Sequence, residues 1–546
     1  MTAFASLDAV STLPPTVNEA VKTYAPGSPE RAALKTKLEA MSRERIELPC
    51  IIGGKEVRSG HLKPSVMPHR HAHVLAEAHM ADRAGIEAAV TAALNARAAW
   101  SAMPWPERAG IFLRAADLLS GPYRDALNAA TMLGQSKTVH QAEIDSAAEL
   151  ADFWRFNAAF LAKIYAEQPL SPAATWNRVD YRPLDGFVLA VTPFNFTSIA
   201  GNLPTAPALC GNTVLWKPAG TAQYAAHFIM EILRRAGLPD GVINLVYGKA
   251  SEVSDVALSH PLLAGVHFTG STEVFDAIMR RVSEGKYRSY PRLVGETGGK
   301  NFILAHASAD PEALAAAIVR GGYEYQGQKC SAASRLYIPK SLWPGLRQRL
   351  AAAVEEIAYG DIADFRNFMG AVIDAASWNK LQAAQEEARR DPCYRLIAGG
   401  AADALEGWFI GPTLVESRDP AARLMKEELF GPIVTAFVYD DAAFEDTIAL
   451  IDRSVDYGLT GAIFAAEASA IAAAQTGLRQ AAGNFYINDK PTGAVVGQQP
   501  FGGGRASGTN DKAGSMWNLM RWLSPRTIKE NFLPPKDWRY PFMGEA

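Results

Sequence analysis

The sequence predicts an α/β protein built as two doubly wound lobes. The chain has 546 residues, of which 48% are hydrophobic, so two or three domains can each bury a core. Short β-like runs alternate with helical periodicity from residue 187 onward and again after residue 301. Such alternation predicts parallel sheets, with ligand sites at the carboxyl ends of their strands.

The segment before the first series is helical. Between residues 85 and 165, apolar side chains recur at helix spacing, beginning with Ile86, Val90, Ala93 and Leu94. We expect these helices to cover one face of a sheet.

Residues 175–182 differ from their surroundings. Trp176, Val179 and Tyr181 alternate with polar residues between two prolines, which indicates an exposed strand or hairpin. An uncovered strand edge invites pairing with another chain, so this segment predicts a contact between subunits.

The first α/β series is expected to hold a nucleotide and the second to form a separate lobe. In the first, strands are expected at 187–191, 213–216, 242–246 and 265–268, with helices at 222–235, from 252 and from 272. In the second, helices are expected at 311–325 and 343–358, with strands at 335–338, 433–438 and 462–464.

Charge and cysteine usage exclude several classes of protein. A formal net charge of −3 offers no broad cationic surface, so we expect neither nucleic acid nor an anionic membrane as a partner. The four cysteines lack CxxC spacing, which predicts neither a disulfide framework nor a metal site. Residues 1–25 resemble neither a signal nor a transit peptide, and apolar runs end well short of about 18 residues, so a cytosolic location is expected.

One cysteine stands in a segment suited to a nucleophile. Cys330 follows Gly327, which permits a positive φ, and Lys329, whose charge would favour the thiolate if it points at the sulfur. Core or incidental roles suffice for the other three thiols, Cys50, Cys210 and Cys393.

Loop segments at 192–196, 216–218, 268–272 and 293–301 are expected to meet where the two lobes face one another. The glycine-rich stretches 295–300 and 501–505 lack phosphate-loop spacing, and the usual dinucleotide fingerprint is absent. Together with the Cys330 turn and residues 427–432, this order of motifs resembles the aldehyde dehydrogenase superfamily over residues 51–530.

The resemblance implies a catalytic role for three residues. Cys330 would attack the aldehyde carbon, and the side-chain amide of Asn195 with the Cys330 backbone N–H would hold the resulting oxyanion. Glu296 would activate water to release the product, which works best with a pKa near neutrality.

The resemblance also implies NAD as the cofactor, with Lys217 at the adenosine ribose, Glu428 at the nicotinamide ribose and a small-residue turn at the pyrophosphate. At Gly220, relatives that prefer NAD often carry an acidic residue, so preference over NADP stays open. The expected cofactor residues are Thr192, Phe194, Lys217, Thr269, Gly270, Ser271, Glu428 and Phe430.

Within the superfamily, segments 192–197, 327–332, 482–490 and 496–503 resemble the branch that oxidises L-glutamate 5-semialdehyde, the open form of 1-pyrroline-5-carboxylate, to L-glutamate in proline catabolism. The resemblance implies that a hydroxyl and a backbone loop bind the substrate carboxylate while two aromatic rings flank its chain. The expected substrate residues are Ser331, Gly493, Ala494, Phe196 and Phe501.

Two other readings stay open at this point. Another aldehyde, such as succinate semialdehyde or an aliphatic aldehyde, could be the substrate. A cysteine hydrolase without a redox step would need a histidine base, and the nearest in sequence is His306. A binding or structural protein without catalytic activity is disfavoured, because nucleophile, base and oxyanion donor are all present.

The resemblance divides the chain into five parts and implies a homodimer or an assembly of dimers through 175–182 and 527–531. We expect an N-terminal and helical part of the NAD-binding domain (1–170), an oligomerisation hairpin (171–184), a Rossmann-like NAD-binding domain (185–298), a catalytic domain (299–505) and a C-terminal oligomerisation segment (506–546).

Overall fold

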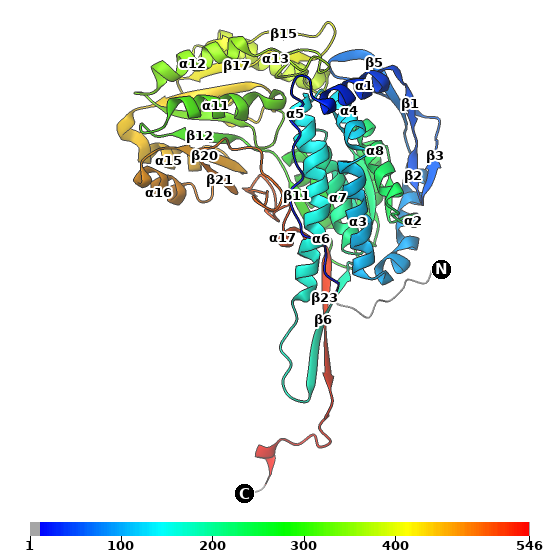
Figure 1. The fold of residues 1–546 in the computed structure, drawn as a ribbon. Helices are drawn as coiled ribbons and strands as arrows, with labels where there is room; N and C mark the ends of the chain where they lie inside the picture. The colour runs from blue at the N-terminus through cyan, green and yellow to red at the C-terminus, as the bar shows by residue number, and fades with distance from the viewer. Residues whose placement is uncertain (1–10, 545–546) are drawn as a thin grey trace.

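The computed structural model describes residues 11–544, which form two sheet-centred lobes and a long two-stranded ribbon that projects away from them (Figure 1). The expectations for residues 1–10 and 545–546 lie outside the described part. Each lobe contains one seven-stranded sheet, so the predicted α/β architecture is confirmed.

The sheet of the first lobe has the strand order β11-β10-β7-β8-β9-β2-β3. Its first five strands are parallel, whereas β2 runs antiparallel to both β9 and β3. The strands are β11 (Arg292–Glu296), β10 (Leu263–Thr269), β7 (Phe187–Thr192), β8 (Thr213–Pro218), β9 (Ile243–Leu245), β2 (Cys50–Ile52) and β3 (Lys55–Val57). Because the chain runs outward from β7 in both directions, a topological switch point lies beside the carboxyl end of β7.

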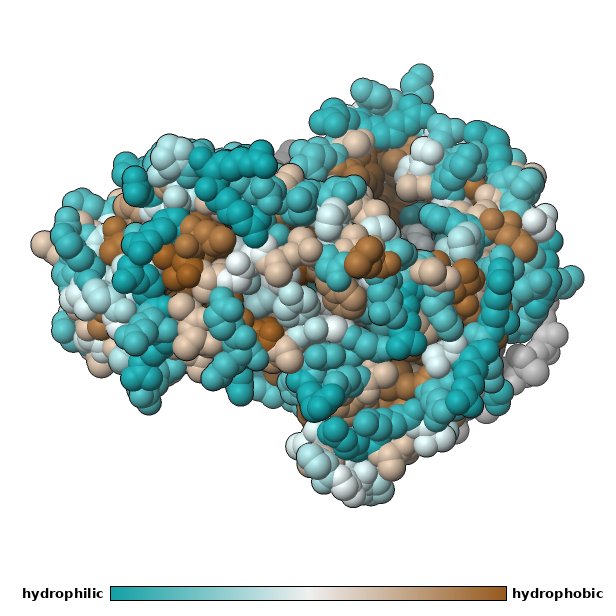
Figure 2. All heavy atoms as spheres, turned by 90° about the horizontal axis from the view of Figure 1, so that it is seen from above, coloured by the Kyte–Doolittle hydropathy of each residue, from teal (hydrophilic) through white to brown (hydrophobic). Residues whose placement is uncertain are grey.

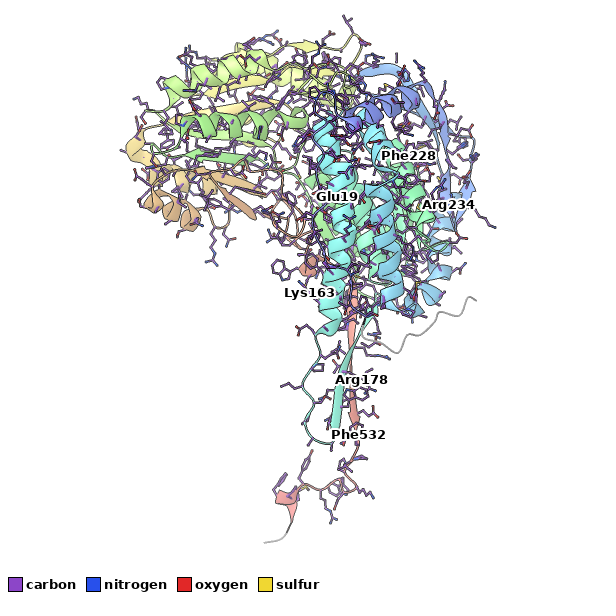
Figure 3. All side chains as sticks on the ribbon, viewed as in Figure 1. Glu19, Lys163, Arg178, Phe228, Arg234 and Phe532 are labelled. Carbon is purple, nitrogen blue, oxygen red and sulfur yellow. The ribbon has the colours of Figure 1, made fainter. Side chains whose placement is uncertain are left out.

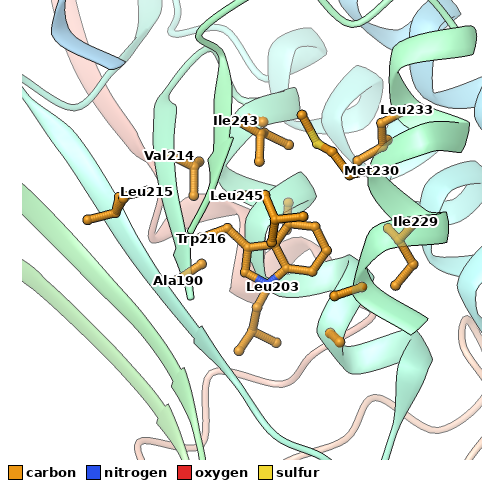
Figure 4. Packing of buried hydrophobic residues seen from close by; sticks show 14 of the residues in the cluster. Ala190, Leu203, Val214, Leu215, Trp216, Ile229, Met230, Leu233, Ile243 and Leu245 are labelled. Carbon is orange, nitrogen blue, oxygen red and sulfur yellow. The ribbon is translucent and has the colours of Figure 1, made fainter. Parts of the chain in front are cut away.

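Helices pack around this sheet and bury a single large core. The indole of Trp216 on β8 lies among aliphatic side chains from the sheet and from α7 and α8, and it donates to Thr192 Oγ1 at 3.1 Å (Figure 4). The principal helices are α2 (Arg83–Ala102), α3 (Trp105–Ser120), α4 (Arg124–Gln135), α5 (Val139–Ala142), the π-helix η1 (Glu143–Glu149), α6 (Leu150–Ala166), α7 (Thr197–Leu209), α8 (Gln223–Arg235), α9 (Ala250–Ser259) and α10 (Thr272–Glu284).

The N-terminal part adds strands that the helical pattern did not predict. A separate three-stranded sheet has the order β1-β5-β4, and α1 (Pro29–Arg43) packs nearby. These strands are β1 (Ile46–Leu48), β4 (Leu62–Met67) and β5 (Arg70–His79). The prediction missed β1, β2 and β3 because each has only three residues, too few to show a period.

The sheet of the second lobe has the order β14-β17-β18-β13-β12-β20-β21, with only β14 antiparallel to its neighbour. Its strands are β12 (Asn301–Ala305), β13 (Ala333–Pro339), β14 (Tyr394–Gly399), β17 (Thr413–Ser417), β18 (Ile433–Tyr439), β20 (Thr460–Phe464) and β21 (Asn484–Ile487). Its helices are α11 (Pro311–Tyr323), α12 (Trp343–Glu356), α13 (Ala375–Arg390), α14 (Arg423–Lys426), α15 (Phe444–Arg453) and α16 (Ala468–Gly477).

Two predicted helices extend too far. The helix expected at 311–325 ends at Tyr323, because Tyr325 and Gln326 take left-handed φ values of 52° and 56° in the following turn η2 (Glu324–Gly327). The helix expected at 343–358 ends at Glu356, since Ile357 is extended.

The ribbon pairs β6 (Thr175–Pro183) with β23 (Leu523–Asn531) in antiparallel register, as the alternation at 175–182 predicted for a strand. Arg178 lies on the ribbon and Phe532 just beyond the end of β23 in Figure 3, and Trp176 on β6 is 51% exposed. Seen from above, the surface is mostly hydrophilic, and apolar side chains form separate patches (Figure 2). No helix within residues 11–544 is both long and apolar enough to span a bilayer.

Candidate active site

The loop after β7 reaches across to the second lobe. The Asn195 amide, which is buried, donates through Nδ2 to the carbonyl oxygen of Gln328 at 3.0 Å. An amide nitrogen carries two hydrogens, so its second N–H stays available for a ligand. This bond ties the expected oxyanion donor to the turn that carries Cys330.

That turn is strained and firmly held. After Tyr325 and Gln326, Gly327 also has a positive φ of 65°, and a Cβ there would come within 2.3 Å of the Gly431 carbonyl oxygen. Gln326 donates to two carbonyl oxygens and accepts from the Gly370 N–H at 2.9 Å. Strained backbone of this kind persists only where the surroundings determine it, and it gathers at functional sites.

Cys330 lies buried at the end of this turn. Burial raises the pKa of the thiol, and the nearby carboxylates of Glu296 and Glu428 raise it further. The expectation that Lys329 promotes the thiolate is wrong, because its ammonium binds Glu324 Oε2 at 3.0 Å. Ionisation of the sulfur therefore needs a base or a positive charge brought in by a ligand.

Glu296 is the last residue of β11. Its Oε2 is buried and has no hydrogen-bond partner within the described part of the chain. Burial raises the pKa of this carboxyl well above its usual range, with Asp511 adding to the rise and Lys512 opposing it. Gly502 gives the carboxylate room, since a Cβ there would lie 2.8 Å from Glu296 Oε1. A protonatable carboxyl therefore stands near the buried thiol.

Glu428 and Phe430 lie in the segment before β18 and contact Gly299 and Phe194. Glu428 Oε1 accepts from the Gly299 N–H at 2.7 Å, and burial raises the pKa of this carboxyl to about 7. Phe430 has a positive φ of 57° and meets the Phe194 ring edge to face at 5.8 Å.

The remaining expected cofactor residues follow strands of the first lobe. Thr192 and Lys217 lie at the ends of β7 and β8. Just after β8, the Ala219 N–H donates to the Thr192 carbonyl oxygen at 3.0 Å and so connects the two strand ends. Thr269 ends β10, Gly270 donates to the Glu296 carbonyl oxygen at 3.2 Å, and Ser271 caps α10. The free N–H groups of a helix start suit a phosphate.

Four of the five expected substrate residues lie in loops of the second lobe, and Phe196 comes from the loop before α7 in the first lobe. Ser331 Oγ lies 2.8 Å from Thr492 Oγ1, which places it beside the loop of Gly493 and Ala494. The backbone of Phe501 pairs with Ala513, next to the Gly502 that faces Glu296. The Phe196 ring lies under the Lys137 ammonium, 4.2 Å from its centroid. Contacts between neighbouring segments thus connect the expected site residues.

A buried charged cluster beneath α7 was missed from sequence. Lys137 Nζ binds Asp145 Oδ2 at 2.7 Å with both side chains fully buried, and Asp145 accepts from the N–H groups of Thr197 and Ser198, each at 2.9 Å. Glu149 Oε2 accepts from Ser198 Oγ at 2.7 Å, and burial raises the pKa of Glu149 to about 8. Four acidic residues within an otherwise apolar helical stretch, Glu143, Asp145, Glu149 and Asp152, were the available signal.

Comparison with known proteins agrees with this geometry. The model of the aldehyde dehydrogenase family matches residues 57–528. The delta-1-pyrroline-5-carboxylate dehydrogenase of Agaricus bisporus is 49% identical over 534 residues, 97% of each chain, and the mitochondrial enzyme of that name from Dictyostelium discoideum is 47% identical over 97% of this chain and 96% of its own. A crystal structure of the Mycobacterium tuberculosis delta-pyrroline-5-carboxylate dehydrogenase bound with NAD is 53% identical, with a TM-score of 0.96, covering 99% of this chain and 100% of that one. The chain belongs to the aldehyde dehydrogenase family.

Proposed function

We propose that this protein oxidises L-glutamate 5-semialdehyde, formed by opening of 1-pyrroline-5-carboxylate, to L-glutamate, as the second step of proline catabolism, with NAD⁺ as the hydride acceptor. The observation that carries the proposal is the bond from Asn195 to the Cys330 turn, with the Glu296 carboxyl buried beside it. The printed names of the relatives supply the substrate.

The residues present fit NAD⁺. The Lys217 ammonium at the end of β8 forms no ion pair within residues 11–544, and Ser271 opens α10 with free N–H groups. Gly298 leaves space that Glu428 Oε2 fills, 2.3 Å from where a Cβ would stand. Lys217 would hold the adenosine ribose, the start of α10 the pyrophosphate, and Glu428 the nicotinamide ribose. When bound, NAD⁺ supplies the acceptor for the aldehyde hydrogen.

Cys330 performs the first covalent step. The thiol gives up its proton to water, its sulfur bonds to the aldehyde carbon, and the carbonyl electron pair moves onto oxygen. Asn195 Nδ2 and the Cys330 backbone N–H donate to that oxygen, and each such donor typically lowers the barrier by about 2.7–4 kcal/mol. Loss of the hydrogen as hydride leaves an acyl group on the sulfur.

Glu296 serves the second step. With its carboxyl deprotonated, Oε2 can take a proton from water that attacks the acyl carbon, and the sulfur then leaves as thiolate. The raised pKa of Glu296 makes it a stronger base than an exposed glutamate. The same carboxyl accepts the proton that hydrolysis releases.

The ammonium and carboxylate groups, both carried by the α-carbon of the amino acid, need partners at the end of the substrate away from the aldehyde. The Ser331 hydroxyl and the backbone N–H groups of Gly493 and Ala494 would bind the carboxylate, each charge-assisted bond contributing about 1.5–3 kcal/mol. Glu149, which forms no direct ion pair within residues 11–544, would receive the ammonium group. Phe196 and Phe501 would flank the aliphatic chain.

The test is formation of NADH from 1-pyrroline-5-carboxylate by the purified full-length protein. Wild type should show a large preference in kcat/KM over succinate semialdehyde and aliphatic aldehydes, and C330A should form no NADH. NADH production by C330A, or equal use of simple aldehydes, would contradict the proposal. A hydrolase reading lacks support here, since His306 bonds Ser308 and packs on Phe444.

We also propose a homodimer, or an assembly of dimers, joined through the ribbon of β6 and β23. Its exposed apolar side chains include Trp176 and Phe532. Light scattering should give a molecular mass equal to a multiple of two chains.

The five domain boundaries stay predictions. The cytosolic location also stays a prediction, because several relatives are named mitochondrial; cell fractionation tests it.

A further inference from the structure

Asn18 connects the first lobe to the loop that follows the expected substrate residues. Its Nδ2 donates to Asp152 Oδ2 on α6 at 2.7 Å and to the Val496 carbonyl oxygen at 2.8 Å. Its Oδ1 accepts from Gln498 Nε2 at 2.9 Å. The amide group thus uses both of its N–H hydrogens and its oxygen to join parts of the chain that lie 478 positions apart.

The segment that carries Asn18 is itself bound to the helices of the first lobe. The Glu19 N–H donates to Asp152 Oδ1 at 2.7 Å. Glu19 lies beside α6 (Figure 3), and its carboxylate binds Arg124 at 2.7 Å and Arg155 at 2.6 Å. Charge-assisted bonds of this kind are about twice as strong as neutral ones, so Asn18 has a fixed position from which to hold the loop.

Residues 495–499 form a closed turn, the Gly497 turn. The Val495 carbonyl oxygen accepts from the N–H groups of Gln498 and Gln499, each at 3.0 Å. Gln499 Oε1 in return accepts from the Val495 N–H at 3.0 Å. These bonds fix the shape of the turn but not its place in the molecule, so contacts from outside must hold it there.

Contacts with the first lobe fix that place. Gly497 has a positive φ of 81°, and a Cβ there would lie 2.1 Å from Cε1 of Phe156, so the backbone of the turn lies directly against α6. A packing contact of this kind has little directional preference, whereas hydrogen bonds do. The bonds of Asn18 with Val496 and Gln498 therefore determine where along the helix the turn sits.

We propose that Asn18 is a positioning residue for the substrate. By holding the Gly497 turn, it sets the backbone N–H groups of Gly493 and Ala494, which come just before the turn, where they meet the substrate carboxylate. The inference rests on the proposed function, because that function assigns the carboxylate to these two residues. Hydrogen bonds weaken steeply as their angle departs from linearity, so a small shift of the turn would lower the affinity for the carboxylate.

The reactive side of the substrate site is held separately. Ser331 Oγ lies 2.8 Å from Thr492 Oγ1, and the Cys330 turn is bound by the Asn195 amide. Neither contact involves the Gly497 turn. Loss of Asn18 should therefore weaken binding of the carboxylate and leave the chemistry at the thiol intact.

Steady-state kinetics of N18A test the inference. The KM for 1-pyrroline-5-carboxylate should rise about tenfold, while kcat and the KM for NAD⁺ stay within about twofold of wild type. Butanal, which matches the carbon chain of the substrate without its charged groups, should keep its wild-type kcat/KM.

N18D separates the hydrogen bonds from the bulk of the side chain. An aspartate has nearly the same shape but accepts where the amide donates, so N18D should raise the KM at least as far as N18A does. T23A is the matched control, because Thr23 is an exposed residue of the same segment whose side chain forms no hydrogen bond within residues 11–544. It should leave the KM unchanged.

Hydrogen exchange of the full-length protein without substrate gives a direct readout of the Gly497 turn. Amides of residues 491–499 should exchange about tenfold faster in N18A than in wild type, while those of the Cys330 turn stay unchanged. Unchanged exchange in N18A, an unchanged KM, or an equal loss of kcat/KM for 1-pyrroline-5-carboxylate and butanal would overturn the inference. A wild-type protein that forms no NADH from 1-pyrroline-5-carboxylate would instead contradict the proposed function, and with it the substrate role of Asn18, even where faster exchange shows that Asn18 holds the turn.

Discussion

The site around Cys330 and the charged cluster beneath α7 both bury ionisable groups, but most of these groups are unpaired in the first and paired in the second. Around the thiol, Cys330, Glu296 and Glu428 form no ion pair within residues 11–544, and burial raises the pKa of each. In the cluster, Lys137 binds Asp145 and Arg124 binds Glu143, all of them buried.

Unpaired buried groups suit proton transfer, whereas buried ion pairs suit the positioning of neighbouring residues. Burial without a charged partner raises the pKa of a carboxyl above its ordinary range, which suits a base. A buried pair resists change, because losing one partner leaves an isolated charge. Asp145 holds the first N–H groups of α7, and Asn195 lies just before that helix. The paired cluster thus helps to position Asn195, the expected oxyanion donor of the site around Cys330.

The largest effect on the unpaired side is expected from E296Q. Acyl transfer to Cys330 should proceed while its hydrolysis slows by about 10²–10⁴-fold, because a general base is lost. Rapid mixing should show one NADH per site followed by a slow steady state. The wild-type steady-state rate should rise with pH as Glu296 deprotonates, and this dependence should vanish in E296Q.

E284Q on the exposed end of α10 is the control and should keep the wild-type burst and pH profile. An E296Q protein that turns over at the wild-type rate would remove Glu296 from the mechanism.

On the paired side, K137M should lower the free energy of unfolding by about 3–5 kcal/mol, since Asp145 would stay buried without its partner. Urea unfolding, followed by tryptophan fluorescence, measures the loss. R43M removes the exposed Arg43–Glu39 pair and should change stability very little.

The double variant K137M/D145N carries no buried charge at this place and should recover much of the loss. If the double variant is as unstable as K137M alone, the loss in K137M does not come from leaving the Asp145 charge without its Lys137 partner.

N195A tests the residue that lies between the charged cluster and the Cys330 turn. We expect kcat to fall by about 10²–10³-fold, because one oxyanion donor is lost, with KM little changed. Stability should drop by only about 0.5–1.5 kcal/mol, the net contribution of one hydrogen bond. A stability loss that accounts for the whole rate loss would make Asn195 purely structural.

The smallest effect is expected from E149Q, which removes a carboxyl of the cluster that forms no direct ion pair in the described residues. The pKa of Glu149 is about 8 in the folded protein against 4.5 for an ordinary glutamate, so the folded state holds the extra proton between these values. Wild-type stability should fall as pH rises from 4.5 through 8, and E149Q should lack this contribution. Melting curves should show E149Q about 2 °C more stable at pH 9 and equal to wild type at pH 4.5.

The sequence indicated candidate residues around Cys330 but gave no clear sign of the charged cluster beneath α7. Cys330, Glu296 and Asn195 lie in short turns at strand ends, where glycines and chemical residue types mark function locally. Both lobes followed from the alternation of strands and helices, with ends misplaced where a strained turn cut α11 short.

The supporting contacts could not be predicted from the sequence, because they join distant parts of the chain. Asp145 meets the Thr197 N–H across 52 positions, and Asn18 donates to the Val496 carbonyl oxygen across 478. The sequence could not show whether Lys329 points at the sulfur, because the geometry of the turn decides this and directs the ammonium to Glu324.

The two strands of the ribbon leave the ribosome at widely separated times. Arg182 on β6 and its partner Ser524 on β23 stand 342 positions apart, so at about 5–20 residues per second a ribosome delivers the second strand roughly 20–70 s after the first. Throughout that interval β6 carries unpaired backbone groups that neighbouring nascent chains could capture. Its charged residues Arg178 and Asp180 would discourage such capture, and they later pair with Glu530 and Arg526 when the true partner emerges.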